Sequence, residues 1–418
     1  MKRALILSVL TFGLVSGFLA TPRAVFAAGK EKVLYSFKYG GTDGIYPQGG
    51  LIFDAAGNLY GTTTYGGGSE CSTGTCGAVF ELSPSGNGTW TETLLHRFSN
   101  DGADGQLPYA SLVLDAAGNL YGTTIGGGVY GGGTVFQLAP GANGSWKEKV
   151  LHSFNGTDGW GPVASLVLDA TGNLYSTTGG GGAYGDGVAF RLTPNSDGSW
   201  KEKVLHNFNG TDGWGPAASL IFDAAGNLYG ATTYGGSSGC SAGCGTVFEL
   251  TSGASGKWNE KVLHMFEGNG RDGYRPSVVI FDSAGNLYGT TGEGGAYGYG
   301  TVFQLAPGTK GGWTEKLLRS FHHRRYPVAG LIFDAAGNLY GTTIQGGGSG
   351  CLDQGCGTVF RFAPEIAGKW TYKVLFSFNG ENGWLPLDSL ILDAAGNLYG
   401  TTEFGGTDGA GTVFELTP

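Results

Sequence analysis

The residues best suited to chemistry in this sequence lie in a recurring Asp-Gly turn that is followed by Pro three positions after the Gly. An aromatic residue stands between Gly and Pro in most copies. The carboxylates are Asp43, Asp104, Asp158, Asp212 and Asp272, and the aromatic residues are Tyr46, Trp160, Trp214, Tyr274, Tyr326 and Trp384. An aromatic face can pack on the C–H side of a pyranose while polar groups bind its hydroxyls. The motif therefore predicts a ligand-binding surface suited to sugars.

The same motif also has a purely structural interpretation. Asp-Gly is a common turn dipeptide, and an aromatic residue near Pro can fill a gap between repeats. The aspartates also offer oxygen ligands for Ca²⁺, although the sequence contains no EF-hand or nonapeptide calcium motif. We therefore expect no cofactor, with Ca²⁺ as the alternative.

One copy of the motif departs from the others and reads His322, His323, Arg324, Arg325, Tyr326 and Pro327. A cationic cluster facing acidic loops predicts either an anionic ligand or ion pairs with those acids. A histidine there could act as a general base because it titrates near neutral pH. No nucleophile or paired carboxylate accompanies the cluster, and no known hydrolase, metalloprotease or phosphate-loop motif occurs in a usable context. We therefore assign no catalytic residue.

The four remaining histidines occupy one equivalent position in four repeats, and other residue types fill that position elsewhere. The histidines are His96, His152, His206 and His264, and the substitutes are Tyr35, Arg319 and Phe376. A position that accepts His, Tyr, Arg and Phe is not expected to be catalytic.

The six cysteines form three local pairs, Cys71/Cys76, Cys240/Cys244 and Cys351/Cys356. In an exported chain, an even number of closely paired cysteines predicts disulfides. Each disulfide would close a very small loop and rigidify it. A thiolate metal site is the alternative, but it would need cysteines from different loops to converge. We expect disulfides and no metal.

A repeat organises the whole chain. The pattern Asp-x-x-Gly-Asn-Leu-Tyr recurs seven times, and its asparagines are 52–61 residues apart. Each repeat contains four strand-like runs, exemplified by residues 165–169, 59–63, 134–138 and 146–154. The 83 glycines fall at fixed places between these runs, as turns between short strands do. The glycine after each repeated Tyr is expected to let a neighbouring repeat approach closely.

The two ends of the array are offset from one another. Residues 31–37 are a fourth-strand run, and residues 412–416 are a third-strand run. Seven copies of each strand exist only if the first strand completes the last repeat. The sequence therefore predicts an all-β fold, a seven-bladed β-propeller of four-stranded antiparallel blades whose ring is closed by the N-terminal strand.

The pattern Asp-Ala-Ala-Gly-Asn-Leu-Tyr-Gly-Thr-Thr, seen at residues 334–343 and followed by Gly357–Phe360, resembles the GloVer tandem-repeat family of exported bacterial proteins. The resemblance recurs seven times and covers nearly the whole chain after its first residues. It implies an extracellular repeat array. It implies no known activity and no catalytic residues.

The first 28 residues resemble a secretory signal peptide, with Lys2 and Arg3, an apolar run and a small-residue exit. We therefore expect residues 29–418 to form a single secreted or periplasmic domain, with no membrane span after cleavage. The formal charge of −9 would become −12 on loss of Lys2, Arg3 and Arg23. An acidic chain of this kind is a poor candidate for nucleic-acid binding.

Two functions follow from these residues. The first is a monomeric binding or scaffold module for an extracellular glycan or a protein at the cell surface. The alternative is a propeller-type hydrolase, lyase or lactonase with its site on the loop rim. The lack of a converging catalytic group favours binding.

Overall fold

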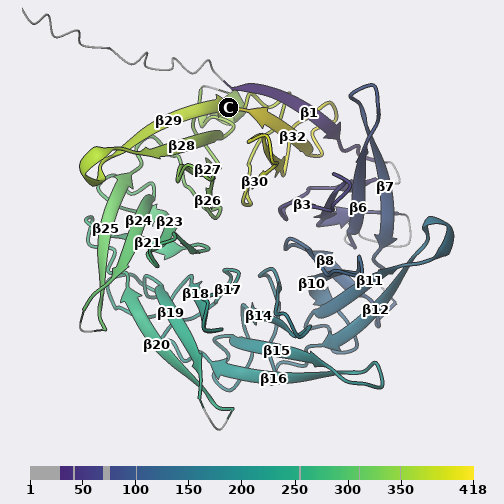
Figure 1. Ribbon diagram of the computed structural model, residues 1–418, viewed down its shortest axis with the longest axis horizontal. Helices are drawn as coiled ribbons and strands as arrows, with labels where there is room; N and C mark the ends of the chain where they lie inside the picture. The colour runs from purple at the N-terminus through teal and green to yellow at the C-terminus, as the bar shows by residue number, and fades with distance from the viewer. Residues whose placement is uncertain are drawn as a thin grey trace, which may run out of the picture.

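The computed structural model describes residues 29–40, 43–68, 76–99, 101–253, 256–309, 311–348 and 350–418. These residues form seven antiparallel sheets arranged as blades around a central axis (Figure 1). The all-β propeller fold is confirmed. The proposed signal peptide, residues 1–28, lies outside the described residues. In the described part of the chain, no helix has the length and apolar character needed to cross a bilayer.

Each blade has a short inner strand, two central strands and a long outer strand. Blades 1 to 7 begin with the inner strands β3 (Ile52–Phe53), β9 (Val113–Leu114), β13 (Val167–Leu168), β17 (Ile221–Phe222), β22 (Ile280–Phe281), β26 (Ile332–Phe333) and β30 (Ile391–Leu392). The second strands are β4 (Leu59–Thr63), β10 (Leu120–Gly127), β14 (Leu174–Thr178), β18 (Leu228–Thr232), β23 (Leu287–Gly294), β27 (Leu339–Thr343) and β31 (Leu398–Thr402).

The outer half of each blade contains the longer strands. The third strands are β6 (Ala78–Pro84), β11 (Thr134–Pro140), β15 (Val188–Pro194), β19 (Thr246–Ser252), β24 (Thr301–Pro307), β28 (Thr358–Pro364) and β32 (Thr412–Thr417). The fourth strands are β7 (Trp90–Arg97), β12 (Trp146–Ser153), β16 (Trp200–Asn207), β20 (Trp258–Met265), β25 (Trp313–Ser320), β29 (Trp370–Ser377) and β1 (Lys30–Ser36).

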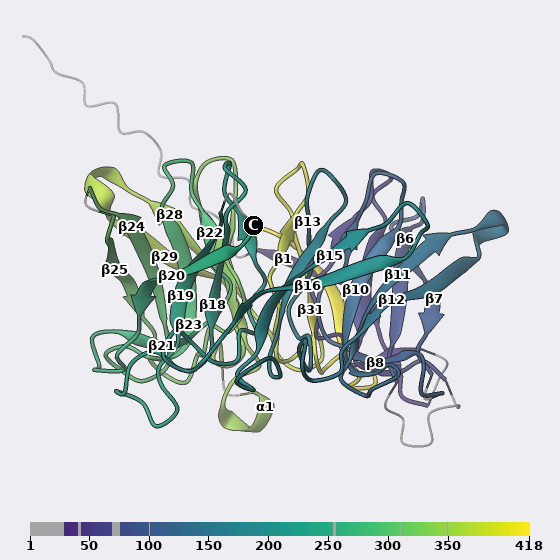
Figure 2. The same ribbon diagram turned by 90° about the horizontal axis from the view of Figure 1, so that it is seen from below.

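Short elements complete the fold. They are the pair β2 (Gly44–Ile45) and β5 (Tyr65–Gly66), the strands β8 (Gly105–Pro108) and β21 (Gly273–Pro276), and the single turns η1 (Ala142–Gly144), α1 (Gly350–Asp353) and η2 (Ile366–Gly368). In the side view, α1, β8 and β21 all lie toward the lower face of the ring (Figure 2). We call this the loop face, because the loops between second and third strands and those between blades meet there.

The ring is closed by the offset ends of the chain. β1 pairs antiparallel with β32, from Lys30 opposite Thr417 to Ser36 opposite Thr412. Gly29 N–H then donates to the carbonyl of Leu375 in blade 6. The predicted closure by the N-terminal strand is confirmed, and it leaves the last blade without an unpaired third strand.

The repeated Asp-x-x-Gly-Asn-Leu-Tyr segment forms the turn between the first and second strands. In blade 1, Asp54 Oδ1 accepts hydrogen bonds from the backbone N–H groups of Ala56 and Asn58, and its Oδ2 accepts from Asn58 Nδ2 and the Tyr60 hydroxyl. Gly57 has φ +86°, which an L residue adopts only at a cost. Burial opposes ionisation, but these hydrogen bonds prevail and lower the pKa of Asp54.

The hydrophobic core is divided among the blade interfaces. Seven clusters of buried side chains each combine residues from two neighbouring blades. One of them joins Tyr60 and Val79 of blade 1 to Leu120 and Phe136 of blade 2. Trp146 of blade 2 packs edge-on against Tyr60, with ring centroids 6.2 Å apart. The repeated tryptophan of the fourth strand therefore stabilises the contact between blades.

A glycine follows six of the seven repeated tyrosines, with Ser176 in blade 3, and this glycine is required within its own blade. A Cβ built on Gly61 would lie 2.5 Å from the ring of Phe80, its cross-strand neighbour in β6, and 3.1 Å from Leu51 of the same blade. The expectation that this glycine admits a neighbouring blade is wrong, because the aromatic ring of the third strand occupies that space.

Candidate functional site

The Asp-Gly-x-x-Pro motifs lie on the loop face, where each pairs with the end of the second strand of its blade. Trp160 bridges to Gly180, Trp214 to Tyr234 and Trp384 to Phe404. Ile45 pairs with Tyr65 and Tyr274 with Glu293 in the same way. The motif therefore extends each blade toward the axis before the inner strand begins.

The structure separates the six motif aromatics into two positions. Trp160, Trp214, Tyr274 and Trp384 directly follow the motif glycine, whereas Tyr46 and Tyr326 directly precede the proline. The residue before proline has positive φ in every blade: Tyr46, Leu107, Gly161, Gly215, Arg275, Tyr326 and Leu385 lie between +49° and +63°. Its N–H donates to a carbonyl of the preceding blade, as Tyr46 does to Ala410. This position serves blade docking.

The aromatic residues of the loop face differ in exposure. Trp160 is 48% exposed and Trp214 is 40% exposed, and three tyrosines of the loops between second and third strands, Tyr130, Tyr184 and Tyr297, are at least 60% exposed. Trp384 packs on Phe404 with ring centroids 5.3 Å apart, and Tyr46 packs on the same ring at 4.8 Å. Trp160 and Trp214 are therefore accessible to a ligand, whereas packing on Phe404 covers part of Trp384 and Tyr46.

A cavity of about 560 Å³ lies on the axis of the ring and is lined by residues from all seven blades. The residue after each motif proline contributes to its wall: Gln48, Tyr109, Val163, Ala217, Ser277, Val328 and Leu387. Near the loop face the wall continues with Tyr234, Arg275, Glu293, Tyr326 and Gln345. The lining is mostly apolar with a few polar groups, as in small-molecule sites.

Asp388 is one of the cavity residues, like Arg275 and Glu293, that the sequence did not single out. It stands where the other blades have Gly49, Ala110, Ala164, Ala218, Val278 and Ala329. Its Oδ2 accepts from the Gly50 N–H at 2.5 Å and from Ser111 Oγ at 2.9 Å, and its Oδ1 accepts from the Ser389 N–H. The break in the repeat at this position was the available signal.

Tyr234, Arg275 and Glu293 form a wall shared by the axial cavity and a second cavity of about 310 Å³. The Arg275 guanidinium lies 5.3 Å from the Tyr234 ring centroid and forms an ion pair with Glu293. The Tyr274 hydroxyl donates to Glu293 Oε2 at 2.8 Å. The exposed Trp214 ring lies 5.1 Å from Tyr234. Aromatic and hydrogen-bonding groups therefore run continuously from the rim into the axis.

The motif aspartates turn away from this wall toward the outer strands. Asp158 Oδ2 lies 3.1 Å from His152 Nε2, and its two oxygens accept hydrogen bonds from the N–H and the side-chain amide of Asn155. Equivalent contacts join His96 to Asp104 at 3.3 Å and His264 to Asp272 at 3.4 Å. The aspartates therefore pair with the repeated histidines.

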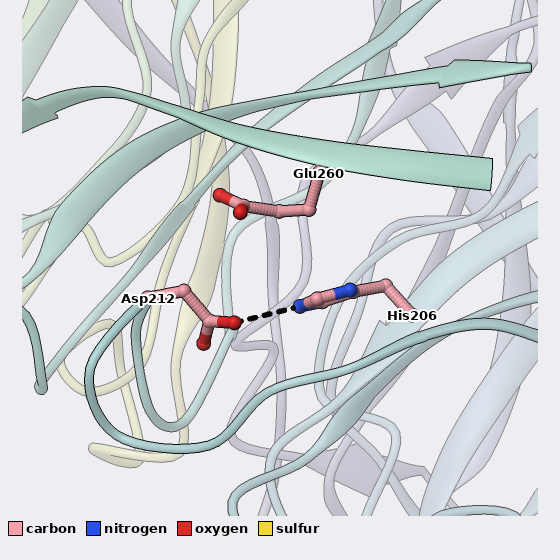
Figure 3. Close-up of side chains that lie close together, drawn as sticks. All are labelled: His206, Asp212 and Glu260. Carbon is pink, nitrogen blue, oxygen red and sulfur yellow. Dashed lines mark hydrogen bonds and ion pairs between the residues drawn. The ribbon is translucent and has the colours of Figure 1, made fainter.

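A glutamate of the next blade completes each of these clusters. Figure 3 shows Glu260 reaching from β20 toward the pair formed by His206 and Asp212, whose Nε2 and Oδ2 are 3.1 Å apart. Burial, followed by the nearby Asp212 carboxylate, raises the pKa of Glu260 to about 7. Glu148, Glu202 and Glu315 have the same environment and pKa values raised to about 7. Sequence reasoning missed these glutamates because their partners stand in another repeat.

The three interfaces without histidine have different clusters. The Tyr35 hydroxyl donates to Asp43 Oδ2 at 2.7 Å. Glu92, whose pKa is raised to about 7 by burial and by the Asp43 carboxylate, lies beside this pair. At the last interface, Asn382 Nδ2 donates to Glu31 Oε2 at 3.3 Å. The Tyr35 contact joins two blades, whereas the Asn382 contact lies within blade 7.

The His322–Tyr326 segment belongs to the remaining interface. Arg325 Nη1 donates to the Tyr372 hydroxyl at 2.9 Å, and Tyr372 stands where all six other blades have the glutamate. His323, Arg324 and Arg325 line a cavity of about 590 Å³ together with Asp353 and Gln354. The His322 ring packs on Tyr297, and burial and the neighbouring cations lower its pKa. Arg325 therefore ties the joining loop to the outer strand of blade 6, while His323 and Arg324 remain beside open space.

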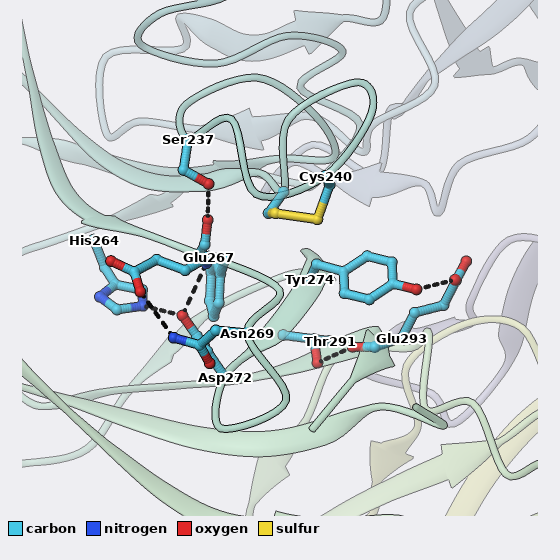
Figure 4. Close-up of a disulfide and its surroundings, with 11 residues drawn as sticks. Ser237, Cys240, His264, Glu267, Asn269, Asp272, Tyr274, Thr291 and Glu293 are labelled. Atoms are coloured by element: carbon cyan, nitrogen blue, oxygen red, sulfur yellow. Dashed lines mark hydrogen bonds and ion pairs between the residues drawn. A yellow bond between two sulfur atoms is a disulfide. The ribbon is translucent and has the colours of Figure 1, made fainter. Parts of the chain in front are cut away.

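Two of the predicted cysteine pairs are disulfides whose two residues are both described. The Sγ atoms of Cys240 and Cys244 are 2.07 Å apart, and those of Cys351 and Cys356 are 2.01 Å apart. Figure 4 shows the Cys240 disulfide beside Tyr274. The Cys244 carbonyl accepts from the Arg275 N–H of the next blade, so the disulfide holds the loop where the next blade docks.

The third predicted pair is Cys71 with Cys76. Cys71 lies outside the described residues, so the structure describes only one member of this pair. Cys76 is fully buried in the core cluster that joins blades 1 and 2. Its carbonyl accepts from the Leu107 N–H of blade 2, as the Cys244 carbonyl accepts from Arg275. Cys76 therefore occupies the docking position of Cys244, and its pairing with Cys71 stays a prediction.

The axial cavity offers little for acid–base chemistry. Among its described lining residues the carboxylates are Asp388 and Glu293, both already hydrogen-bonded, and none of these residues is a histidine. A hydrolase or lyase site needs an acid and a base near the reacting bond.

The fold and the loop-face site define this chain as a seven-bladed β-propeller with an axial cavity. The model of the Gloeobacter/Verrucomicrobia repeat matches residues 23–242 and 237–418. The chain therefore belongs to this repeat family. No curated protein matches the chain.

Three solved structures are similar in fold at low sequence identity. PorZ, a bacterial surface component of the type-IX secretion system of Porphyromonas gingivalis, is 14% identical with a TM-score of 0.52, over 88% of this chain and 46% of PorZ. A putative gluconolactonase is 16% identical with a TM-score of 0.41, over 75% and 89%. A gluconolactonase from Xanthomonas campestris is 15% identical with a TM-score of 0.40, over 72% and 82%. The likeness to PorZ shows a shared fold alone.

Proposed function

We propose that this protein is an exported binding module that takes a carbohydrate at the loop face, with the ligand entering the axial cavity beside Tyr234. The observation that carries the proposal is the continuous path from the exposed Trp214 to the wall of Tyr234, Arg275 and Glu293. Tryptophan and tyrosine faces bind the apolar side of sugar rings, and the groups behind them bind hydroxyls.

The size and charge of the site support an uncharged, hydroxyl-rich ligand. The axial cavity of about 560 Å³ lies within the usual range of small-molecule sites, about 300–1,000 Å³. Arg275 and Glu293 neutralise one another, so the wall offers hydrogen bonds without net charge. The disulfide pairs support an oxidising compartment, and we propose a secreted or periplasmic location.

Glycan-array and polysaccharide pull-down experiments on the chain lacking residues 1–28 test this function. We expect binding to a defined set of neutral glycans. Trp214→Ala and Tyr234→Ala should each lower the affinity at least tenfold, because each removes an aromatic face of the path.

Tyr130→Ala is the matched control. Tyr130 is 60% exposed on the same face but lines neither the axial nor the 310 Å³ cavity. Absence of binding to every glycan, or equal losses for Tyr130→Ala and Tyr234→Ala, would contradict a carbohydrate site at this wall.

A further inference from the structure

Two of the clusters between blades bring three different donor groups to one point. In His206, Asp212 and Glu260, and again in His264, Asp272 and Glu315, one nitrogen and two carboxylate oxygens all lie within 4.8 Å of one another. The histidine comes from the outer strand of one blade, whereas the aspartate comes from the loop that enters the next blade and the glutamate from the outer strand of that next blade. These residues lie outside the axial cavity and have no part in the proposed carbohydrate site.

Buried polar atoms in the second cluster lack a partner. Asp272 is only 5% exposed, and its Oδ1 accepts no hydrogen bond. Glu315 Oε1 and His264 Nε2 are also buried without a partner in ideal hydrogen-bond geometry, although the His264 ring lies 3.4 Å from Asp272 Oδ2 and the Glu315 carboxyl group lies within hydrogen-bonding reach of Asp272. In the first cluster, Glu260 Oε1 is unpartnered, as is the equivalent oxygen of Glu31, Glu92, Glu148 and Glu202 at the other interfaces. Unpaired buried polar atoms are costly, and a bound ligand is one way to satisfy them.

The clusters also suit a positive charge. Two carboxyl groups share each of them, and a cation bound between them compensates their charge when both are ionised. At the interface of blades 5 and 6, the chain supplies cations of its own: the Arg319 guanidinium lies 3.8 Å from the Tyr372 ring centroid, and Arg325 donates to the Tyr372 hydroxyl. There the glutamate is also lost. The interface of blades 5 and 6 therefore has cationic side chains in place of the set of histidine, aspartate and glutamate.

The surrounding residues hold the ligand atoms in place. Asn209 donates from its backbone N–H and its side-chain amide to the two oxygens of Asp212, both at 3.0 Å. The Glu267 N–H donates to Asp272 Oδ2 at 3.1 Å (Figure 4). The His264 ring packs edge-on against Phe266, with ring centroids 4.6 Å apart. Such supporting contacts are typical around metal ligands.

We propose that His206–Asp212–Glu260 and His264–Asp272–Glu315 each bind one zinc ion that joins two neighbouring blades. One imidazole and two carboxylates suit zinc better than calcium, which takes six or more oxygen ligands. Three protein ligands leave one tetrahedral position for water. Zn–N and Zn–O bonds of about 2.0–2.2 Å require the ligand atoms to draw slightly together.

The test is zinc titration of the chain lacking residues 1–28, without an affinity tag, after chelator treatment and dialysis. Calorimetry should give two equivalents with a Kd of micromolar or tighter. Cobalt should add visible absorption bands typical of tetrahedral coordination. Zinc should raise the melting temperature, whereas calcium at the same concentration should not.

Paired variants locate the sites. Glu260→Gln with Glu315→Gln removes one ligand from each proposed site while keeping side-chain volume, and it should lower zinc affinity at least tenfold and abolish the cobalt bands. Glu148→Gln with Glu202→Gln is the matched control. These glutamates occupy equivalent positions, but the three donor atoms of their clusters do not all lie within 4.8 Å of one another. Circular dichroism confirms that each variant is folded.

Three results would overturn the proposal: absence of zinc binding, zinc binding unchanged by the Glu260 and Glu315 substitutions, or equal losses in the control pair. His322→Gln with His323→Gln should leave the two equivalents intact. Loss of zinc in that variant would assign the metal to the loop face instead.

Discussion

The guanidinium of Arg319 stacks over the ring of Tyr372 across the interface of blades 5 and 6, with 3.8 Å from its central carbon to the ring centroid. Four other interfaces place a histidine at the position of Arg319 and a glutamate at that of Tyr372. At this interface, a contact between a cation and an aromatic ring thus replaces the contact between histidine and glutamate. Tyr372 also accepts the hydrogen bond from Arg325, which ties the unusual loop to the same contact.

This contact should contribute measurably to stability. In a double-mutant cycle of Arg319→Met and Tyr372→Leu, we expect a coupling energy of about 0.5–2 kcal/mol, because the guanidinium is partly withdrawn from water. Urea unfolding of the four proteins measures it. Lys316→Met, at an exposed residue that bonds only to the Gly368 carbonyl, should change stability little. A coupling energy near zero would show that the stacking is incidental.

The stability of the chain should depend on pH through Glu92. Burial and then the Asp43 carboxylate raise the pKa of Glu92 from 4.5 to about 7, with Arg97 opposing them. The folded state then binds this proton more tightly than the unfolded state. The stabilising contribution is present below about pH 4.5 and is lost as pH rises through 7.

Glu92→Gln should therefore remove its share of the dependence between pH 5 and 7.5, to which Glu148, Glu202, Glu260 and Glu315 contribute in the same way. It should stabilise the protein at pH 7.5 by about 1–2 kcal/mol, a value that allows for partial exposure. Urea midpoints at both pH values, in chelator-treated protein, measure this. Glu81→Gln is the control, because Glu81 instead accepts a hydrogen bond from Ser83 on the same strand. A variant that keeps the wild-type slope would rule out Glu92 as one of its sources.

Asp388 should hold the inner ends of three blades together. Its replacement by Ala leaves the donors of Gly50, Ser111 and Ser389 without their acceptor and should cost about 1–3 kcal/mol. Asp388→Asn keeps one oxygen acceptor and should cost less. Asp408→Ala, at an exposed loop residue, is the control. Equal stability of the Ala and Asn variants would mean that these hydrogen bonds contribute little.

The Cys240–Cys244 disulfide should protect its loop. Cys240→Ser with Cys244→Ser should lower stability by about 1–2 kcal/mol, because the bond closes a very short loop. The larger effect should be faster proteolysis between residues 237 and 243, where the loop loses its anchor beside the next blade. Mass spectrometry of limited digests identifies the cut. Cleavage first at another loop would contradict this role.

The sequence by itself determined the number of blades, their four strands and the closure of the ring. Repeats such as Asp54–Tyr60 read directly as turns, because each turn is made by residues adjacent in the chain. The offset between residues 31–37 and 412–416 was enough to place β1 beside β32. Local cysteine spacing likewise predicted the two described disulfides, whereas the burial of Cys76 between two blades came only from the structure.

Only the tertiary structure decided what the motif residues contact. His206 meets Glu260 across a blade interface, and Tyr234 meets Arg275 of the following blade. The sequence predicted one binding surface for the motif aspartates and aromatic residues. Blade packing instead turns the aspartates toward the outer strands and leaves Trp214 exposed at the loop face. The physical reason is that each repeat buries its faces against its neighbours, so contacts between residues about fifty positions apart depend on how the blades stack.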